Sequence, residues 1–197
     1  MLTVTTAATK FDLIDVATAR TALGITDNKD DAALAAFIKR ASDVIARSCR
    51  RVFALETVTE TLRPDHYLSD LVLSRYPVAE ITSIAEGDDT LAAGDYEVDK
   101  SPGTVKRLYR DHHCHWSRCK IVVVYSAGYT LPTDTPDALQ QACVQLVKSY
   151  YMSADRDPMI RSETSDNISS ASYFGDADPL PPEVRGLVGQ FRNIRTR

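Results

Sequence analysis

The fold class is decided by residues 30–63, DDAALAAFIKRASDVIARSCRRVFALETVTETLR. The spacing of their hydrophobic residues changes about halfway along this segment. Up to residue 52, small and apolar residues recur at spacings of three and four, which predicts a helix over about residues 31–52. After Phe53, three threonines (Thr57, Thr59, Thr61) alternate with Val58, Glu60 and Leu62, as in a strand with two different faces. A strong helix that runs straight into a strand predicts an α+β protein.

Two more helices are expected around this segment. Asp15 is a suitable N-cap and Gly24 a suitable end for a short helix between them. A helix of about residues 136–154 begins after Pro136, a residue tolerated in the first helical turn. We expect these two helices and residues 31–52 to form a small helical core, in which Leu34, Phe37, Ile38, Ala41 and Ile45 pack against Leu139, Cys143, Leu146 and Val147.

The rest of the chain divides into a β-rich region and a C-terminal arm. Between about residues 55 and 129, short segments rich in β-branched and aromatic residues are separated by turns such as SPG, which predicts hairpins and a small sheet. Residues 155–197 read as an extended arm, a short helix in PPEVRGLVGQF and a basic tail. We interpret residues 1–197 as a single domain, with a helical core (about 13–53 and 136–154) interrupted by a β-rich insertion.

Composition limits the possible function classes. The chain has 197 residues, is 25% charged and has a formal net charge of −4, which argues against a protein whose main task is to bind nucleic-acid phosphates. Neither a secretory signal nor an apolar run of about 20 residues is visible, so we expect no membrane association. Four scattered cysteines predict free thiols in a reducing environment.

Residues 110–119, RDHHCHWSRC, suggest a metal site at first reading. Cys114 and Cys119 with His113 and His115 supply the sulfur and nitrogen ligands that tetrahedral zinc prefers. Their crowding into so short a stretch is unlike the two separated ligand pairs of structural zinc sites. Strand-like sequences on both sides favour a polar hairpin loop anchored by Trp116, so we expect no metal; a small zinc-stabilised binding module remains the alternative.

Catalytic motifs are missing from the sequence: it contains no nucleophile elbow, phosphate-binding glycine loop or HExxH pair. We therefore expect neither an enzyme nor a bound cofactor. The arm is more informative, because five apolar anchors stand among serines, as in segments that become ordered against another chain. These predicted subunit contacts are Met159, Ile160, Ile168, Tyr173 and Phe174.

The order of these parts resembles the head–tail connector, or adaptor, proteins of long-tailed phages, prophages and gene transfer agents. The similarity covers about residues 13–191. It is carried by LIDVATARTALGI, by the helix-to-strand segment quoted above, by LSRYPVAEITSIAEGDDTLAAGDYEVD, by VVVYSAGY and by RDPMIRSE. The histidine-rich segment departs from that pattern.

The resemblance implies a non-enzymatic virion protein at the head–tail interface, assembled in the bacterial cytoplasm. It implies a ring of about twelve copies beneath the portal protein, with a free face for a downstream neck or tail-completion protein. Double-stranded DNA would pass through this ring without specific binding. The C-terminal region would contact the portal, which assigns that role to Arg192, Arg195 and Arg197. A tail-completion or neck protein of the same virion is the nearest alternative.

Overall fold

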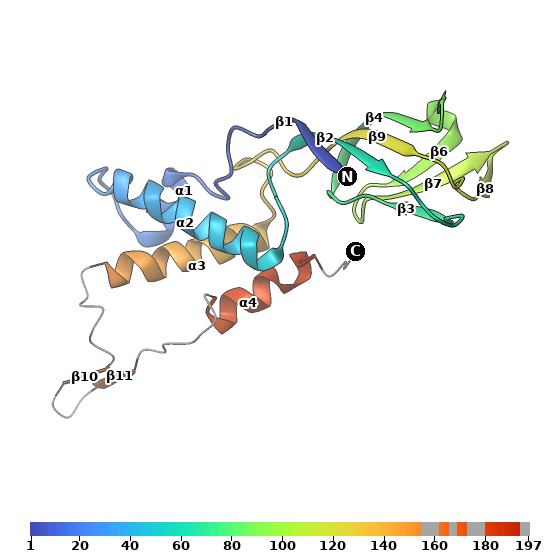
Figure 1. Ribbon diagram of the computed structural model, residues 1–197. Coiled ribbons are helices and arrows are strands. Elements are labelled where there is room, and N and C mark those ends of the chain that lie inside the picture. Colours follow the sequence, from blue (N-terminus) through green and yellow to red (C-terminus); the bar gives the residue numbers. More distant parts are fainter. Residues whose placement is uncertain (155–161, 166–168, 173–179, 194–197) are drawn as a thin grey trace. The chain divides into compact units, whose positions relative to one another are not determined.

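The computed structural model describes residues 1–154, 162–165, 169–172 and 180–193 (Figure 1). The chain forms two compact units. The first, called the β unit here, comprises Met1–Phe11 and Val52–Asp134; the second, the helical unit, comprises Asp12–Arg51 and Thr135–Arg197. The predicted helical core and β-rich insertion correspond to these units, except that the first eleven residues belong to the β unit. The α+β prediction is confirmed, whereas the single-domain interpretation stays a prediction.

The helical unit contains the predicted helices. Its elements are α1 (Val16–Leu23), α2 (Asp31–Cys49), α3 (Asp137–Ser153), α4 (Pro182–Val188), the 3-10 turn η2 (Gly189–Phe191) and a short antiparallel pair, β10 (Ser162–Ser165) and β11 (Ser169–Ser172).

Local sequence signals set the ends of the first two helices. The Asp15 side chain accepts a hydrogen bond from the Thr18 N–H at 2.7 Å, and Gly24 ends α1 with a φ of 71°, as predicted. α2 ends three residues before the predicted Val52. Arg50 adopts the left-handed conformation there, and the Arg51 N–H turns back to the Ala46 carbonyl. This is the hydrogen-bonding pattern of a Schellman motif, and it stops the helix.

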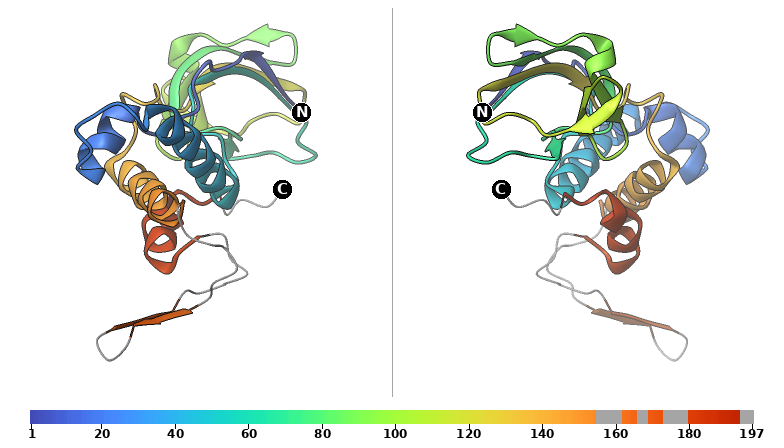
Figure 2. Two further views of the ribbon diagram at one scale, coloured as in Figure 1. Left: turned by 90° about the vertical axis from the view of Figure 1, so that its left-hand side faces the viewer. Right: turned by 90° about the vertical axis from the view of Figure 1, so that its right-hand side faces the viewer.

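The core of the helical unit lies between α2 and α3, as Figure 2 shows and as the sequence predicted. Leu34, Ile38, Ala41 and Ile45 from α2, and Leu139, Cys143, Leu146 and Val147 from α3, are buried. The prediction was less accurate for Phe37, which is only partly buried and lies beside Tyr150 with ring centroids 6.2 Å apart. Ser42, which is not among the predicted core residues, is also buried. Its hydroxyl accepts a hydrogen bond from the Leu13 N–H at 3.0 Å, so this buried polar group has a partner.

α4 completes this core. It packs against α3, and Leu180, Val184 and Val188 are buried. The Cys49 thiol lies 3.7 Å from the Val188 carbonyl, to which it donates a weak hydrogen bond. α4 and the turn that follows are thus bound to the end of α2.

The β unit consists of two antiparallel sheets. The larger has the order β1-β2-β9-β4-β5, and the smaller has the order β3-β7-β6, with β8 also paired to β7. The strands are β1 (Leu2–Thr6), β2 (Glu56–Leu62), β3 (Asp70–Val72), β4 (Val78–Glu86), β5 (Asp89–Thr90), β6 (Tyr96–Asp99), β7 (Thr104–Tyr109), β8 (His112–Cys114) and β9 (Ile121–Ala127).

The core of the β unit is built from both sheets. Val58 on β2, Ile84 on β4, Val123 on β9 and Val105 on β7 are fully buried in one cluster. The alternation read from residues 56–62 is confirmed, because every second residue of β2 from Glu56 to Glu60 faces this core. β1 was not predicted. Its partner strand β2 lies about 50 residues further along the chain, so no short hairpin turn in the sequence indicates the pairing.

A buried carboxylate lies inside the β unit. Glu60 is fully buried and accepts hydrogen bonds from the Tyr125 hydroxyl at 2.8 Å and from the Ser74 N–H at 2.9 Å. The Ser74 hydroxyl donates to the other carboxylate oxygen. Burial, together with the neighbouring Glu60 carboxylate, raises the pKa of Tyr125, so this phenol stays protonated and remains a donor. The network joins β2, β9 and the segment after β3.

Among the helices that the structure describes, none is both long enough and apolar enough to cross a bilayer. The five predicted arm anchors (Met159, Ile160, Ile168, Tyr173, Phe174) lie outside the described residues, as do Arg195 and Arg197.

Candidate functional site

The histidine-rich segment forms the tip of a hairpin. Arg110 and Asp111 have φ values of 50° and 67°, the left-handed geometry of a tight two-residue turn, and they connect β7 to β8. The sequence predicted a longer loop here. Instead, residues 112–114 pair with residues 107–109 of β7.

The four zinc-ligand candidates have separate surroundings. His113 and His115 are exposed, and the His113 Nε2 lies 3.9 Å from the Glu97 carboxylate. Cys119 packs against the hydrophobic core of the β unit, and burial raises the pKa of its thiol. Within the described part of the chain, no three His, Cys, Asp or Glu side chains are placed so that they could hold a metal ion. The zinc-module alternative therefore has no ligand set among these residues.

Trp116 anchors the hairpin, as the sequence suggested. Its side chain is fully buried, its indole N–H donates to the Val105 carbonyl at 3.1 Å, and its backbone N–H donates to the Leu68 carbonyl at 2.8 Å. The segment is thus a structural hairpin whose tip is exposed.

An ion pair supports the base of the same hairpin. The Arg107 Nε donates to the Glu86 carboxylate at 2.9 Å, and the Ser117 N–H donates to the other oxygen at 2.7 Å. Burial alone would raise the pKa of Glu86. The hydrogen bonds from Ser117 and Arg107 outweigh burial and hold the pKa below its usual value. Glu86 is therefore ionised at neutral pH, and its role is to connect β4 with β7 and with the segment that precedes β9.

One face of the larger sheet carries no charge over most of its width. The register places Thr59 between Thr3 and Val124, and Thr61 opposite Val122. The side chains of this uncharged sheet face are Thr3, Thr57, Thr59, Thr61, Ser83, Ala85, Val122, Val124 and Ser126. The exposed Glu80 of β4, opposite Ser126, is a charged residue that borders this set. Centres of protein interfaces are depleted of charged residues, whereas nucleic-acid interfaces are rich in them. This face suits contact with protein.

Exposed aromatic side chains lie on the β unit outside this face. Tyr67 is 64% exposed and Tyr109 is 61% exposed. Each ring combines apolar area with a hydroxyl, a combination enriched at protein interfaces. His66, beside Tyr67, is exposed, and its Nδ1 lies 2.6 Å from the Asp65 carboxylate.

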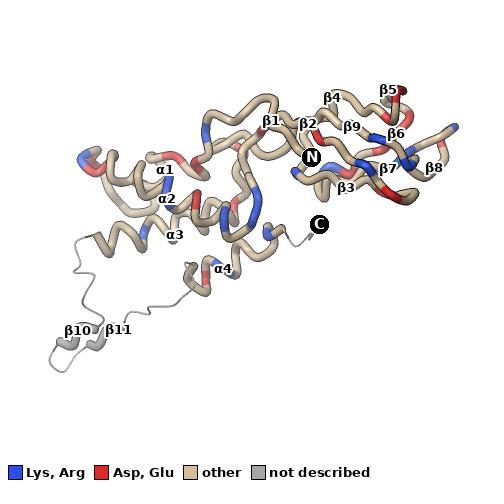
Figure 3. The backbone as a smooth tube through the Cα atoms, viewed as in Figure 1, with Lys and Arg blue, Asp and Glu red and all other residues tan. Residues whose placement is uncertain are grey.

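Arginines gather at the C-terminal end of α2 (Figure 3). The sequence presented Arg47, Arg50 and Arg51 as the end of one helix and Arg192 as part of a separate tail. The structure brings Arg192 to α2, because the Asn193 N–H donates to the Cys49 carbonyl at 2.8 Å. No local signal could have revealed this contact, since it depends on how α4 packs.

Comparison with solved structures finds the same fold in particle necks. The chain matches one in the "Neck of empty GTA particle computed with C6 symmetry" with a TM-score of 0.59 and 20% identity. It matches one in the "Neck of native GTA particle computed with C12 symmetry" with a TM-score of 0.58 and 20% identity. Both matches cover 100% of this chain and 97% of the other. At this identity, the likeness establishes the fold alone.

Comparison with protein families gives a single assignment. Curated proteins yield no match to the sequence. The sequence profile described as "Head completion protein" matches residues 12–194, which include nearly all of the helical unit and most of the β unit. This chain belongs to the head completion protein family, whose members are structural components of a virion.

Proposed function

We propose that this chain is a head–tail connector, or adaptor, that forms a ring under the portal protein of a DNA-filled head. The ring would have about twelve copies, extend the DNA channel and offer its far face to neck or tail-completion proteins. The observation that carries the proposal is the match of residues 12–194 to the head completion family, together with a fold shared over the whole chain with neck subunits. The C12 and C6 symmetries of those necks support a ring.

The surfaces of the chain agree with this role. A closed ring needs two different contact faces on each copy. The uncharged sheet face and the exposed aromatic residues of the β unit provide protein-contact surfaces, and the predicted arm anchors provide a segment that would grip a neighbouring copy. A net charge of −4 suits a conduit, because each phosphate–arginine contact would slow the passage of DNA.

Deletion of the chain from cells that produce the particle tests the role. We expect heads that contain DNA but lack tails, visible by electron microscopy, and recovery of complete particles when the chain is supplied in trans. Normal tailed particles from the deletion strain would contradict a connector role.

Substitutions in the arm test the ring contact. Changing Tyr173 and Phe174 together to serine should weaken self-association more than folding, because interface anchors contribute most of the binding energy. Unchanged assembly with normal particles would remove the arm from the contact.

A neck or tail-completion protein at another level of the same particle is the second candidate, because the family description specifies only head completion. Co-purification separates the two. An adaptor should be recovered with the portal protein, whereas a tail-completion protein should be recovered with the tail tube.

A further inference from the structure

Two segments far apart in the sequence form one basic surface at the end of the helical unit. The Asn193 N–H donates to the Cys49 carbonyl at 2.8 Å, and Arg51 Nη1 donates to the Phe191 carbonyl at 3.4 Å. These bonds hold the chain after η2 against the last turn of α2. Arg50, Arg51 and Arg192 therefore lie together, with Arg47 at the rim; these four residues are called the arginine surface here.

The charges of this surface are only partly balanced within the chain. Arg47 pairs with Asp43 at 2.9 Å, and Arg51 is partly buried. Arg50 and Arg192 are both exposed, and the described residues contain no carboxylate within ion-pair distance of either. The helix dipole favours cations near the end of α2, which accounts for Arg47 but leaves Arg192, from another segment, unexplained.

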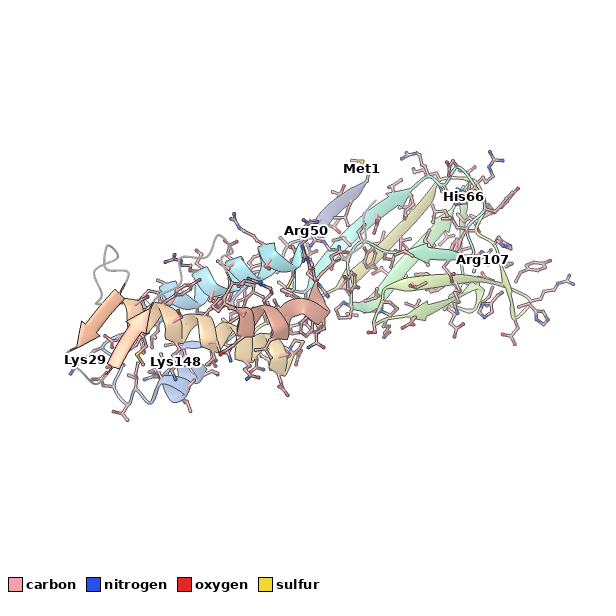
Figure 4. The ribbon with its side chains drawn as sticks, turned by 90° about the horizontal axis from the view of Figure 1, so that it is seen from below. Met1, Lys29, Arg50, His66, Arg107 and Lys148 are labelled. Atoms are coloured by element: carbon pink, nitrogen blue, oxygen red, sulfur yellow. The ribbon has the colours of Figure 1, made fainter. Side chains whose placement is uncertain are left out.

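The backbone at Arg50 is a second observation that points to use of its side chain. Arg50 has φ 53° and ψ 40°, a left-handed conformation that costs an L-residue free energy and that glycine adopts freely. Helices ending in this motif usually have glycine at this position. Here an exposed arginine occupies it, and Figure 4 shows Arg50 at the C-terminal end of α2. The fold does not require a guanidinium group at this position. Contact with a partner would explain why an arginine occupies it.

The chemistry of the surface selects the class of partner. Every cation in it is an arginine, whose planar group forms two parallel hydrogen bonds with a carboxylate. Phosphate has a similar geometry, but specific DNA-binding surfaces make many phosphate contacts and belong to basic domains. This chain has a net charge of −4, and of the exposed arginines in this surface only Arg50 and Arg192 have no ion pair within the described residues, because Arg47 pairs with Asp43. A protein surface bearing carboxylates fits better than a duplex.

We propose that the arginine surface docks onto a carboxylate-bearing surface of the portal protein, and that the end of α2 is as much a part of this contact as the C-terminal segment. This inference rests on the proposed connector function and deepens it. It extends the portal contact predicted at Arg192, Arg195 and Arg197 to residues of α2, chiefly Arg50.

Charge reversal in the full chain tests the inference. The test variant is Arg50→Glu with Arg192→Glu. The matched control is Lys39→Glu with Lys148→Glu, two exposed lysines of the same unit that have no ion pair in the described part of the chain. Both variants change the net charge equally. Figure 4 shows Lys148 toward the other end of the unit from Arg50. Thermal unfolding of each variant establishes that it is folded.

Binding to the purified portal protein of the same particle is then measured at two salt concentrations, with a duplex oligonucleotide as a second probe. We expect the test variant to bind the portal at least about tenfold more weakly than the wild type, and the control to stay within about threefold. Wild-type binding should weaken as salt increases.

Three results would overturn the inference. Equal portal binding by the wild type and the test variant would reject the arginine surface while leaving the connector function intact. Loss of duplex binding with unchanged portal binding would assign the surface to DNA. Failure of the wild type itself to bind the portal would contradict the connector function as well.

Discussion

The backbone N–H of Asn193 donates a hydrogen bond to the carbonyl of Cys49 at 2.8 Å, and the Cys49 side chain is fully buried beneath that contact. Burial raises the pKa of the Cys49 thiol to about 11, although the nearby Arg51 and Arg192 act in the opposite direction. The C-terminal segment therefore helps to cover this cysteine, and burial keeps its thiol protonated.

Thiol alkylation measures this protection. A chain ending at Gly189 loses the Asn193 contact, and Cys49 should then react faster than in the full chain, because the thiolate is the reactive form. Cys143, buried beside Ser42 with its pKa raised to about 12, is the internal control and should stay slow in both chains. Rates follow from mass spectrometry of the alkylated peptides. An unchanged Cys49 rate would mean that the C-terminal segment does not cover the end of α2.

Replacing Arg50 with glycine should separate stability from binding. Glycine relieves the left-handed backbone strain at this position, so we expect the free energy of unfolding to rise by about 1 kcal/mol. The same substitution removes an exposed guanidinium, so portal binding should fall. Urea unfolding and a binding titration measure the two effects. A variant that is more stable and binds as well as the wild type would leave Arg50 without a role in docking.

Tyr125→Phe removes a donor from the buried Glu60 network and should destabilise the protein. A hydrogen bond to a buried carboxylate contributes about 1.5–3 kcal/mol, and its loss leaves Glu60 incompletely paired. The urea midpoint should fall accordingly. Tyr67→Phe is the matched control, because this tyrosine is 64% exposed, and its midpoint should remain near that of the wild type. Equal midpoints for both variants would contradict the structural importance of the network.

The lowered pKa of Glu86 predicts how the stability of the protein changes at acidic pH. Its pKa is lower in the folded protein than in the unfolded chain, so it stabilises the fold above the unfolded pKa of about 4. That contribution is lost as the pH falls through the folded value. Glu86→Gln should thus be less stable than the wild type at pH 7, and the difference should shrink below about pH 4.

Urea midpoints between pH 7 and pH 3 measure the Glu86 effect. Glu80→Gln, at an exposed position of the same strand, is the control and should show a difference that does not depend on pH. A constant difference between Glu86→Gln and the wild type over this range would show that the Arg107 and Ser117 contacts do not favour the ionised form.

Local signals account for the part of the fold that the sequence predicts. α1, α2 and α3 follow from apolar spacing and from caps such as Asp15, all within a few residues of one another. The alternation also places Glu60 on the same side of β2 as Val58 and Leu62, but its burial was not predicted. Its partners Ser74 and Tyr125 could not be identified, because they come from distant segments.

Non-local packing accounts for what the sequence left open. β1 is a short run of alternating threonines whose identity as a strand depends on pairing with β2. The arginine surface depends on α4 returning to the end of α2, so a helix end and a tail that look separate become one site. The histidine-rich segment resembles a metal site only in sequence, because neighbouring side chains on a strand point to opposite faces of the sheet.

Native mass spectrometry of the purified chain, alone and mixed with its portal protein, tests the connector function most directly. A single copy has a mass of 21.8 kDa. The connector account predicts that mixing yields a complex in which about twelve copies are bound to one portal ring. A chain that stays at its own mass in the presence of the portal, or that binds only to the tail tube, would contradict it.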